Sequence, residues 1–425
     1  MEYSIFQKQS PEENPNEGEG INLPSDHNDK SALIMRIGRA LLALGSPAHR
    51  IETTLTMLAN RLHLDSQFFS TPTALIASLG NQRQSHTHLV RVESTTIDLG
   101  KLSDILGVMD RLSDDDISIR QASIRVADIY NSPPRYGAML TWLAFALLSA
   151  GAALFLGGGW AEVVLAGLIG CTVGLLNLIG NYSESVRRLF VATAATLGSI
   201  IATVFIAFQP GTDMITPVIA GLIILIPGMD LTVSTRELAS GHLVSGSARM
   251  AGAIMVLMTI LFGLAVGNYI GEQISGPALV GQALPVAHWI PLAALPVVAF
   301  AFTILFRARA QDGLWILLSS YISVYALSFS QQISGPIASA ALAAAIVGTA
   351  ANIFTRITRK PSSIIYVPGL LLLVPGAMGF RSLNQILEHN IIAGLEGLFN
   401  VFITAVALAT GMVISSVLVP SKNEL

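Results

Sequence analysis

Charged residues are scarce in this chain, and the scarcity limits what the chain can be. Asp, Glu, Lys and Arg account for 12% of its 425 residues, whereas hydrophobic residues account for 52% and the mean hydropathy is +0.62. Soluble domains carry roughly 25% charged residues, so these charges are too few to cover a water-facing surface. The composition therefore excludes an ordinary soluble protein, and it also lacks the basic clusters of a nucleic-acid-binding protein.

Cysteine and the common catalytic motifs are nearly or wholly absent. Cys171, the one cysteine, lies in an apolar segment, which excludes a disulfide or a thiolate metal site within one chain. His86 and His88 fall on one face of an expected strand, where two histidines are typical of surface rather than of a metal site. The chain has no GxSxG, HExxH or Walker A motif, and no GxGxxG that opens a helix. We therefore predict no enzyme, no metal and no cofactor.

The N-terminus lacks the apolar core and basic flank of a cleaved signal peptide. Residues 1–29 contain seven acids and one base, Lys8, and predict a disordered acidic tail. Residues 30–135 predict a small soluble α/β domain, in which Ser46 caps the second helix and Pro47 occupies its first position. The expected helices cover residues 31–44, 47–62, 99–112 and 117–129, and the expected strands cover residues 64–71, 73–79 and 86–93.

Beyond residue 135 the chain consists largely of apolar segments. A membrane-spanning helix needs about 17–25 apolar residues, and most of the ten segments meet that requirement. They cover residues 138–156, 163–179, 189–208, 214–229, 250–270, 290–306, 313–329, 337–354, 364–378 and 398–419. The sequence thus predicts a polytopic α-helical membrane protein with ten transmembrane helices, preceded by the small soluble α/β domain.

The positive charges in the loops predict the orientation. If residues 30–135 are cytoplasmic, the outer loops carry only Arg381. The inner loops then carry Arg187, Arg188, Arg236, Arg307, Arg309, Arg356, Arg359, Lys360 and Lys422. This asymmetry follows the positive-inside rule, so both termini are expected in the cytoplasm. We expect a multi-pass protein of a bacterial inner membrane whose partner is the lipid bilayer.

The apolar region contains an internal repeat. An offset of 148 residues superposes the first five segments on the last five, and residues 221–228, GLIILIPG, match residues 369–376, GLLLLVPG. Because five is odd, copies of five spans each lie upside down relative to one another, as in many secondary transporters. The expected copies are residues 136–271 and 272–425.

The substrate site is expected where Pro-Gly interrupts each copy. The interrupted segments are also the shortest, and such a pair at corresponding positions points to the site of a transporter. A capping box follows each Pro-Gly, Ser234 to Glu237 and Ser382 to Gln385. Free N–H groups at helix N-termini suit a small carboxylate-bearing substrate. In the alternative interpretation, Pro-Gly only ends two membrane helices and serine caps two surface helices.

The candidate residues for substrate binding surround these two breaks. They are Pro227, Gly228, Asp230, Thr232, Ser234, Arg249, Pro375, Gly376, Ser382 and Asn384. Asp230 is either an intramembrane carboxylate that carries a coupling proton or a plain interfacial aspartate, and its counterpart in the second copy is Met378. Arg249 either pairs with the substrate carboxylate or extends to the interface.

The distinctive motif of the expected soluble domain is Gly-Ser-Pro-Ala-His-Arg-Ile-Glu at residues 45–52. Its polar residues, His49, Arg50 and Glu52, open a helix, where Glu52 complements the helix dipole and Arg50 binds an anion or a neighbouring loop. We interpret the motif as a contact that docks this domain onto the membrane half.

Several of these stretches resemble one protein family. Residues 44–55, LGSPAHRIETTL, residues 68–78, FFSTPTALIAS, and residues 226–232, IPGMDLT, are similar to the threonine/serine exporter family, as is Val-Pro-Gly at 374–376. The resemblance covers roughly residues 30–415. It implies a ten-helix exporter that uses the proton gradient to move threonine and serine outward. A similar system carries the two halves on separate subunits and is assigned to succinate export.

We therefore predict a proton-coupled exporter of threonine and serine. A dicarboxylate such as succinate is the alternative substrate, and it would require a second cationic group, Arg236 or Arg249. Two other classes remain open: a membrane-anchored hydrolase, and a sensor whose N-terminal domain binds a ligand. A homo-oligomer is compatible with the sequence, which does not reveal its size.

Overall fold

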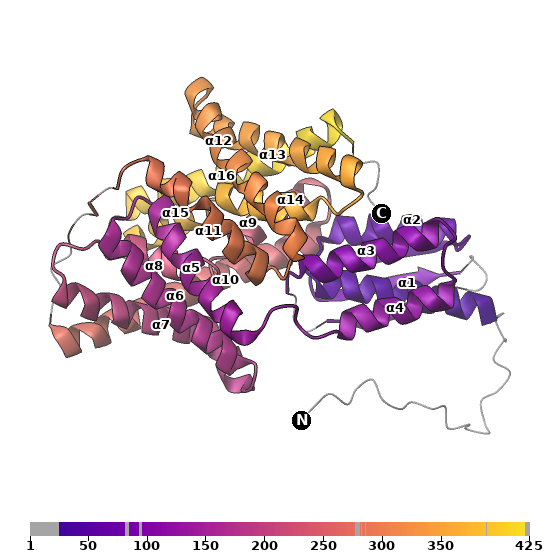
Figure 1. Ribbon diagram of the computed structural model, residues 1–425, viewed down its shortest axis with the longest axis horizontal. Coiled ribbons are helices and arrows are strands. Elements are labelled where there is room, and N and C mark those ends of the chain that lie inside the picture. Colours follow the sequence, from indigo (N-terminus) through magenta and orange to yellow (C-terminus); the bar gives the residue numbers. More distant parts are fainter. Residues whose placement is uncertain are drawn as a thin grey trace.

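The computed structural model describes residues 25–80, 85–92, 96–276, 281, 283–284, 286–387 and 389–420. Most of the expected acidic tail lies outside these residues. The first helix begins at Ser25, ahead of the boundary expected at residue 29. Helices make up most of the described chain, and Figure 1 shows α1–α4 at one end of the molecule and most of the later helices at the other.

Residues 25–131, here called the N-terminal unit, combine four helices with a small sheet. The elements are α1 Ser25–Ala43, α2 Ala48–Arg61, β1 Ser66–Ser70, β2 Ala74–Leu79, β3 His86–Arg91, α3 Leu99–Ser113 and α4 Ile119–Asn131. The strands form an antiparallel sheet in the order β1-β2-β3, with Ala77 paired to Phe68 on one side and to His88 on the other. Apolar side chains from both helices and strands, among them Ile37, Leu55 and Leu75, form one buried cluster.

The expected start of α2 is wrong by one residue. Pro47 is the N-cap, and the helix begins at Ala48, so Ser46 does not cap it. Pro47 has a φ of −62° but an extended ψ of 149°, which keeps it outside the helix. Its ring cannot accept a hydrogen bond, so the first helical N–H groups must find an acceptor elsewhere in the molecule.

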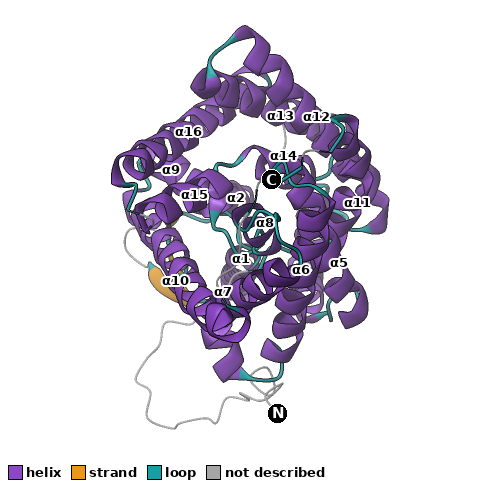
Figure 2. Ribbon diagram, turned by 90° about the vertical axis from the view of Figure 1, so that its left-hand side faces the viewer, coloured by secondary structure: helices purple, strands orange, loops and turns teal. Residues whose placement is uncertain are grey.

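The described residues between 138 and 418 form a helical bundle. Its helices are α5 Ala138–Phe155, α6 Trp160–Gly180, α7 Glu184–Phe208, α8 Ile215–Gly221, α9 Gly228–Ala239, α10 Leu243–Ser275, α11 Trp289–Leu305, α12 Gly313–Ile333, α13 Pro336–Thr358, α14 Ser363–Leu373, α15 Gly376–Leu387 and α16 Ile391–Leu418. Seen end-on, α5–α7 and α10 occupy the lower half of the bundle and α12, α13 and α16 the upper half (Figure 2). Helices α5 and α11 pack against each other.

Among the described residues, eight helical segments are long and apolar enough to cross a membrane, including the stretch Ser363–Ile386 that contains α14 and most of α15. The span expected over residues 290–306 corresponds to α11, an apolar helix of 17 residues that is shorter than these eight segments. The expected span over residues 214–229 is not one helix, because α8 ends at Gly221 and α9 begins only at Gly228. The chain is thus a multi-pass membrane protein by its apolar helices.

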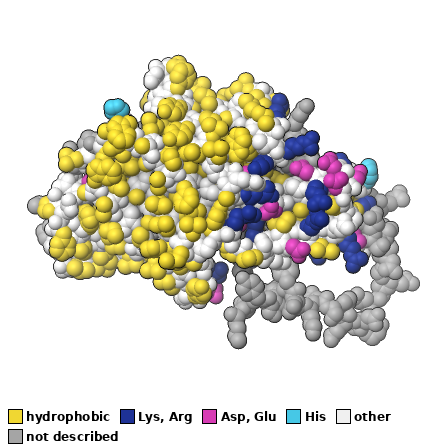
Figure 3. All heavy atoms as spheres, viewed as in Figure 1, with side chains coloured by type: hydrophobic (Ala, Val, Ile, Leu, Met, Phe, Trp, Pro, Cys, Tyr) yellow, Lys and Arg dark blue, Asp and Glu magenta, His cyan; other side chains and the backbone are white. Residues whose placement is uncertain are grey.

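The surface agrees with that conclusion. Figure 3 shows hydrophobic side chains across the bundle, whereas most charged side chains gather over the N-terminal unit and its junction with the bundle. Large apolar side chains of the bundle, such as Met139, Phe262 and Ile392, are more than half exposed. An apolar band of this extent is unstable in water and suits contact with lipid.

Neighbour relations in the bundle recur between its two halves. Helix α6 packs against α7 and α8, and α12 packs against α13 and α14 in the same way. Helix α10 packs against α7 and α9, and α16 packs against α13 and α15. Segments at the 148-residue offset therefore have equivalent neighbours.

Candidate functional site

The two Pro-Gly motifs meet in the interior of the bundle. Pro227 is the N-cap of α9, and Gly228 and Gly376 are the first residues of α9 and α15. A Cβ atom added to Gly228 would lie 3.2 Å from the Cα of Gly376, and one added to Gly376 would lie 3.2 Å from the Cα of Gly228. Backbones can approach this closely only where both residues lack a side chain. The repeat therefore brings together two helix starts that are 148 residues apart in sequence.

The capping boxes predicted after these motifs are wrong. Ser234 and Ser382 lie inside α9 and α15, because both helices begin directly after proline. Their hydroxyls donate to carbonyls of the preceding turn, Ser234 to Leu231 at 2.9 Å and Ser382 to Met378 at 2.8 Å. Serine hydroxyls inside helices commonly bond in this way.

Thr232 behaves as these serines do. It is fully buried, and its hydroxyl donates to the carbonyl of Gly228 at 3.2 Å. Asn384 lies on α15, at a position between buried and exposed.

Glu237 joins the bundle to the N-terminal unit. Its side chain is fully buried, and its Oε1 accepts the backbone N–H of Ala48 at 2.9 Å. This carboxylate supplies the acceptor that the N-terminus of α2 needs. Its Oε2 pairs with Nε of Arg249 at 3.3 Å, and Nη1 of Arg249 pairs with Asp230 at 3.0 Å. Arg249 thus lies between two carboxylates of α9, one buried and one half exposed.

The residues of the N-terminal motif also contact the bundle. Arg50 donates to the hydroxyl of Ser362 at 2.8 Å. Glu52 accepts the backbone N–H of Ser70 at 2.7 Å through Oε1, while its Oε2 lies 3.2 Å from Nε2 of His242. These contacts support the docking role predicted for the motif, and they fix α2 against the loops before α10 and α14.

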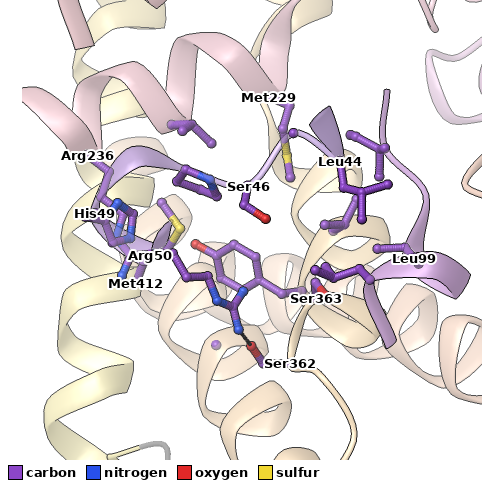
Figure 4. A pocket seen from close by; sticks show the side chains of 18 of the residues that line it. Leu44, Ser46, His49, Arg50, Leu99, Met229, Arg236, Ser362, Ser363 and Met412 are labelled. Carbon is purple, nitrogen blue, oxygen red and sulfur yellow. Dashed lines mark hydrogen bonds between the residues drawn. The ribbon is translucent and has the colours of Figure 1, made fainter. Parts of the chain in front are cut away.

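A cavity of about 270 Å³ lies between the N-terminal unit and the bundle. Figure 4 shows His49 and Arg236 close together at the left of the view, Arg50 extending toward Ser362 below, and Ser46 and Met229 nearer the centre. Helices α10, α13, α14 and α16 complete the lining with Arg249, Asn352, Ser363, Tyr366 and Met412, among others. The cavity reaches Asp230 in the first turn of α9, so it extends from α2 to the vicinity of the Pro-Gly contact.

The environment of His49 is strongly positive. Burial, followed by the charges of Arg236 and Arg50, lowers the pKa of His49 from 6.5 to about 3. Its imidazole is therefore neutral near pH 7. Burial disfavours any charge on the imidazole itself, whereas the positive charges of Arg236 and Arg50 would attract an anion such as a carboxylate to this part of the cavity.

The structure thus groups only some of the predicted residues. The cavity is lined by four of them, Asp230, Arg249, His49 and Arg50. Glu52 does not line the cavity, and its carboxylate contacts the imidazole of His242. The remaining candidates do not line the cavity either: Pro227, Gly228, Pro375 and Gly376 form the contact between helix starts, and Thr232, Ser234, Ser382 and Asn384 lie within α9 and α15.

Sequence reasoning missed several residues of this region. It took Glu237 as part of a capping box and gave no role to His242, Ser363 or Tyr366. Only Glu237 carried a signal, since it follows Asp230 by seven residues, two helical turns along one face. Among the described residues, no group of three or more His, Cys, Asp or Glu side chains could hold a metal ion.

Fungal proteins are among the curated relatives of the chain. It is 26% identical over 374 residues to an uncharacterized protein of Schizosaccharomyces pombe, covering 83% of this chain and 48% of that protein. It is also 26% identical to pheromone-regulated membrane protein 10 of Pichia sorbitophila (86% and 39%) and of Candida albicans (84% and 33%). The chain therefore spans half or less of these relatives. No solved structure matches it.

Family comparison covers both halves of the chain. Residues 32–271 match the ThrE family model, which spans the N-terminal unit and helices α5–α10. Residues 292–418 match a second model, described as "Threonine/Serine exporter, ThrE", which spans α11–α16. With both models matched in one polypeptide, this chain belongs to the threonine/serine exporter family.

Proposed function

We propose that the protein is a secondary active exporter of small amino acids, threonine and serine, driven by the proton gradient. The observation that carries the proposal is the contact between Gly228 and Gly376, where two interrupted helices of the repeat begin against each other. Transporters built from inverted repeats place their substrate at such interruptions, because unpaired N–H groups and helix dipoles there bind a carboxylate.

The architecture that goes with this function is two inverted five-helix repeats, residues 136–271 and 272–425, behind an α/β domain at residues 30–135. Equivalent neighbours of α6 and α12, and of α10 and α16, support the repeat. Ten crossings result if α8 with α9, and α14 with α15, each form one interrupted span beside α11. The basic loops then face the cytoplasm with both termini. A bacterial inner membrane remains a prediction, since the relatives described above are fungal.

Asp230 is the proposed proton carrier. It lines the cavity, is half exposed and pairs with Arg249, which also holds the buried Glu237. Protonation of Asp230 would release one contact of Arg249 without breaking the other. A carboxylate with a partner that can be exchanged in this way is suited to coupling.

The experiment is transport by the purified chain in liposomes. Labelled threonine and labelled succinate are followed with and without an imposed pH gradient, for the wild type, for Asp230→Asn and for the exposed control Asp116→Asn. We expect gradient-stimulated threonine movement that only Asp230→Asn abolishes. Movement of succinate without threonine would replace the substrate with a dicarboxylate. Absence of both in sealed vesicles would contradict the exporter and favour a hydrolase or a sensor.

A further inference from the structure

We infer that the cavity between α2 and α9 is the cytoplasm-facing binding site for the small amino acid, and that Arg236 binds its carboxylate. The inference rests on the proposed function. It adds where the substrate binds, which residue binds its carboxylate, and that the N-terminal unit covers the site. Transport alone would not require any of the three.

Arg236 differs from the other arginines of the cavity in its partners. Arg249 pairs with Asp230 and Glu237, and Arg50 donates to Ser362. Within the described part of the chain, no carboxylate lies within 4.0 Å of the Arg236 guanidinium, which sits beside the hydroxyl of Tyr366. Arginine offers a planar set of donors that matches a carboxylate, so an incoming carboxylate supplies the missing counter-ion.

Besides the hydroxyl of Tyr366, two further buried polar atoms of the lining have no hydrogen-bond partner among the described residues. Oγ of Ser363 and Nδ1 of His49 are buried, and neither has a partner among the described residues. Ser363 as a whole is 5% exposed. Buried polar atoms are nearly always hydrogen-bonded, so both await a polar ligand. The imidazole is neutral and adds no second charge to the site, although it can donate or accept.

The size of the cavity suits a small metabolite, and the charges of its lining favour an amino acid over a dicarboxylate. At about 270 Å³ it is smaller than the roughly 300–1,000 Å³ of sites for drug-sized ligands. Asp230 also lines it and is half exposed, so an ammonium group would be attracted there. A second carboxylate placed beside Asp230 would instead be repelled, because Arg249, the cation that pairs with Asp230, is already shared with the carboxylate of Glu237. The positive charge of Arg236 and the negative charge of Asp230 in one small cavity thus match the two charges of a zwitterion.

The cavity is roofed by the turn that leads into α2. Ser46, Pro47 and His49 line it from the N-terminal unit, while α9 and α14 line it from the bundle. A ligand in the cavity would contact the N-terminal unit and the bundle at the same time. Because the cavity lies on the side of the Pro-Gly contact that faces the N-terminal unit, an exported substrate would bind here before it passes that contact.

The test is equilibrium binding of labelled threonine to the full detergent-solubilised chain. Unlabelled serine, succinate and threonine methyl ester compete, the ester being a threonine without a free carboxylate. Arg236→Gln is compared with Arg356→Gln, an exposed arginine that bonds the carbonyl of Pro420. Ser363→Ala is included because the Ser363 hydroxyl makes no hydrogen bond to any residue that the structure describes. Thermal unfolding of each variant confirms that it is folded.

We expect Arg236→Gln to weaken threonine binding on the order of 10- to 100-fold and Ser363→Ala by a smaller factor. Arg356→Gln should bind as the wild type does, serine should compete, and the ester and succinate should not. Unchanged binding by folded Arg236→Gln and Ser363→Ala would overturn the site even if threonine is still transported. Competition by succinate or by the ester as strong as by serine would overturn carboxylate recognition of a zwitterion. A wild type that transports neither amino acid would instead defeat the proposed function.

Discussion

The carboxylate of Glu237 holds groups from two parts of the chain, the backbone of Ala48 and the guanidinium of Arg249. Replacing Glu237 with Gln keeps the shape but removes the charge. We expect the free energy of unfolding to fall by about 3 kcal/mol, the lower end for breaking a buried ion pair, because Arg249 keeps Asp230. Denaturation in detergent, followed by tryptophan fluorescence, measures this loss. Glu184→Gln, which removes an exposed pair with Arg188, is the control and should cost less than about 1 kcal/mol. Equal losses in the two variants would refute the special role of Glu237.

His49 makes stability depend on pH. Burial and the neighbouring arginines lower its pKa from 6.5 to about 3. As the pH falls below 6.5, His49 becomes protonated in the unfolded chain, whereas in the folded chain it stays neutral until near pH 3. The free energy of unfolding therefore falls by up to ~1.4 kcal/mol per pH unit. We expect His49→Gln to lose less stability than the wild type between about pH 7.5 and about pH 5. Thermal unfolding at both values measures the difference, and parallel losses would contradict it.

At the scale of elements, the sequence predicted what local signals determine. The strand β3 follows from alternation within residues 86–93, and the long helices follow from apolar runs. Most of their ends lie within five residues of the prediction, whereas α10 and α16 each begin seven residues earlier than expected. The start of α9 was misplaced because Ser234 has the local pattern of a cap, while the contact of Gly228 with Gly376 belongs to tertiary structure. The bond of Glu237 to Ala48 spans 189 residues, and no pattern in either segment specifies it. The cavity could not be predicted for the same reason.

The Pro-Gly contact predicts how the two interrupted helices respond to a methyl group. In Gly228→Ala the new Cβ would lie 2.3 Å from Cγ1 of Val374 and 3.2 Å from the Cα of Gly376, so the helix starts must separate. We expect threonine transport in liposomes to fall on the order of 10-fold, while the protein still inserts. Gly379→Ala on α15 is the matched control, since its Cβ would meet only ordinary contacts at 3.7 Å or more. A similar rate in both variants would show that the contact is not needed for transport.

At the scale of the whole molecule, the N-terminal unit closes one end of the bundle. Asp98 pairs with Arg307 and Asp104 with Arg309, in the loop between α11 and α12. The loops before α10 and α14 bind the unit through His242 and Ser362. These three loops and the helices beside them carry several of the arginines predicted to face the cytoplasm, among them Arg236, Arg307 and Arg359. The docking surface of the unit therefore lies on the side of the bundle that the sequence predicts to face the cytoplasm.

In the proposed orientation and function, the N-terminal unit covers the cavity and must move before a substrate enters from the cytoplasm, since a transporter exposes its site to one side at a time. Glu52 and His242 lie on opposite sides of this junction with their side chains 3.2 Å apart. We expect that a short reducible dithiol-reactive crosslinker between Glu52→Cys and His242→Cys, in a Cys171→Ala background, stops threonine export and that reduction restores it. Glu184→Cys with Arg188→Cys, one turn apart on α7, is the control for the reagent and should export normally. Full export by the crosslinked Glu52–His242 pair would mean that the substrate reaches the Pro-Gly contact without any movement of the N-terminal unit.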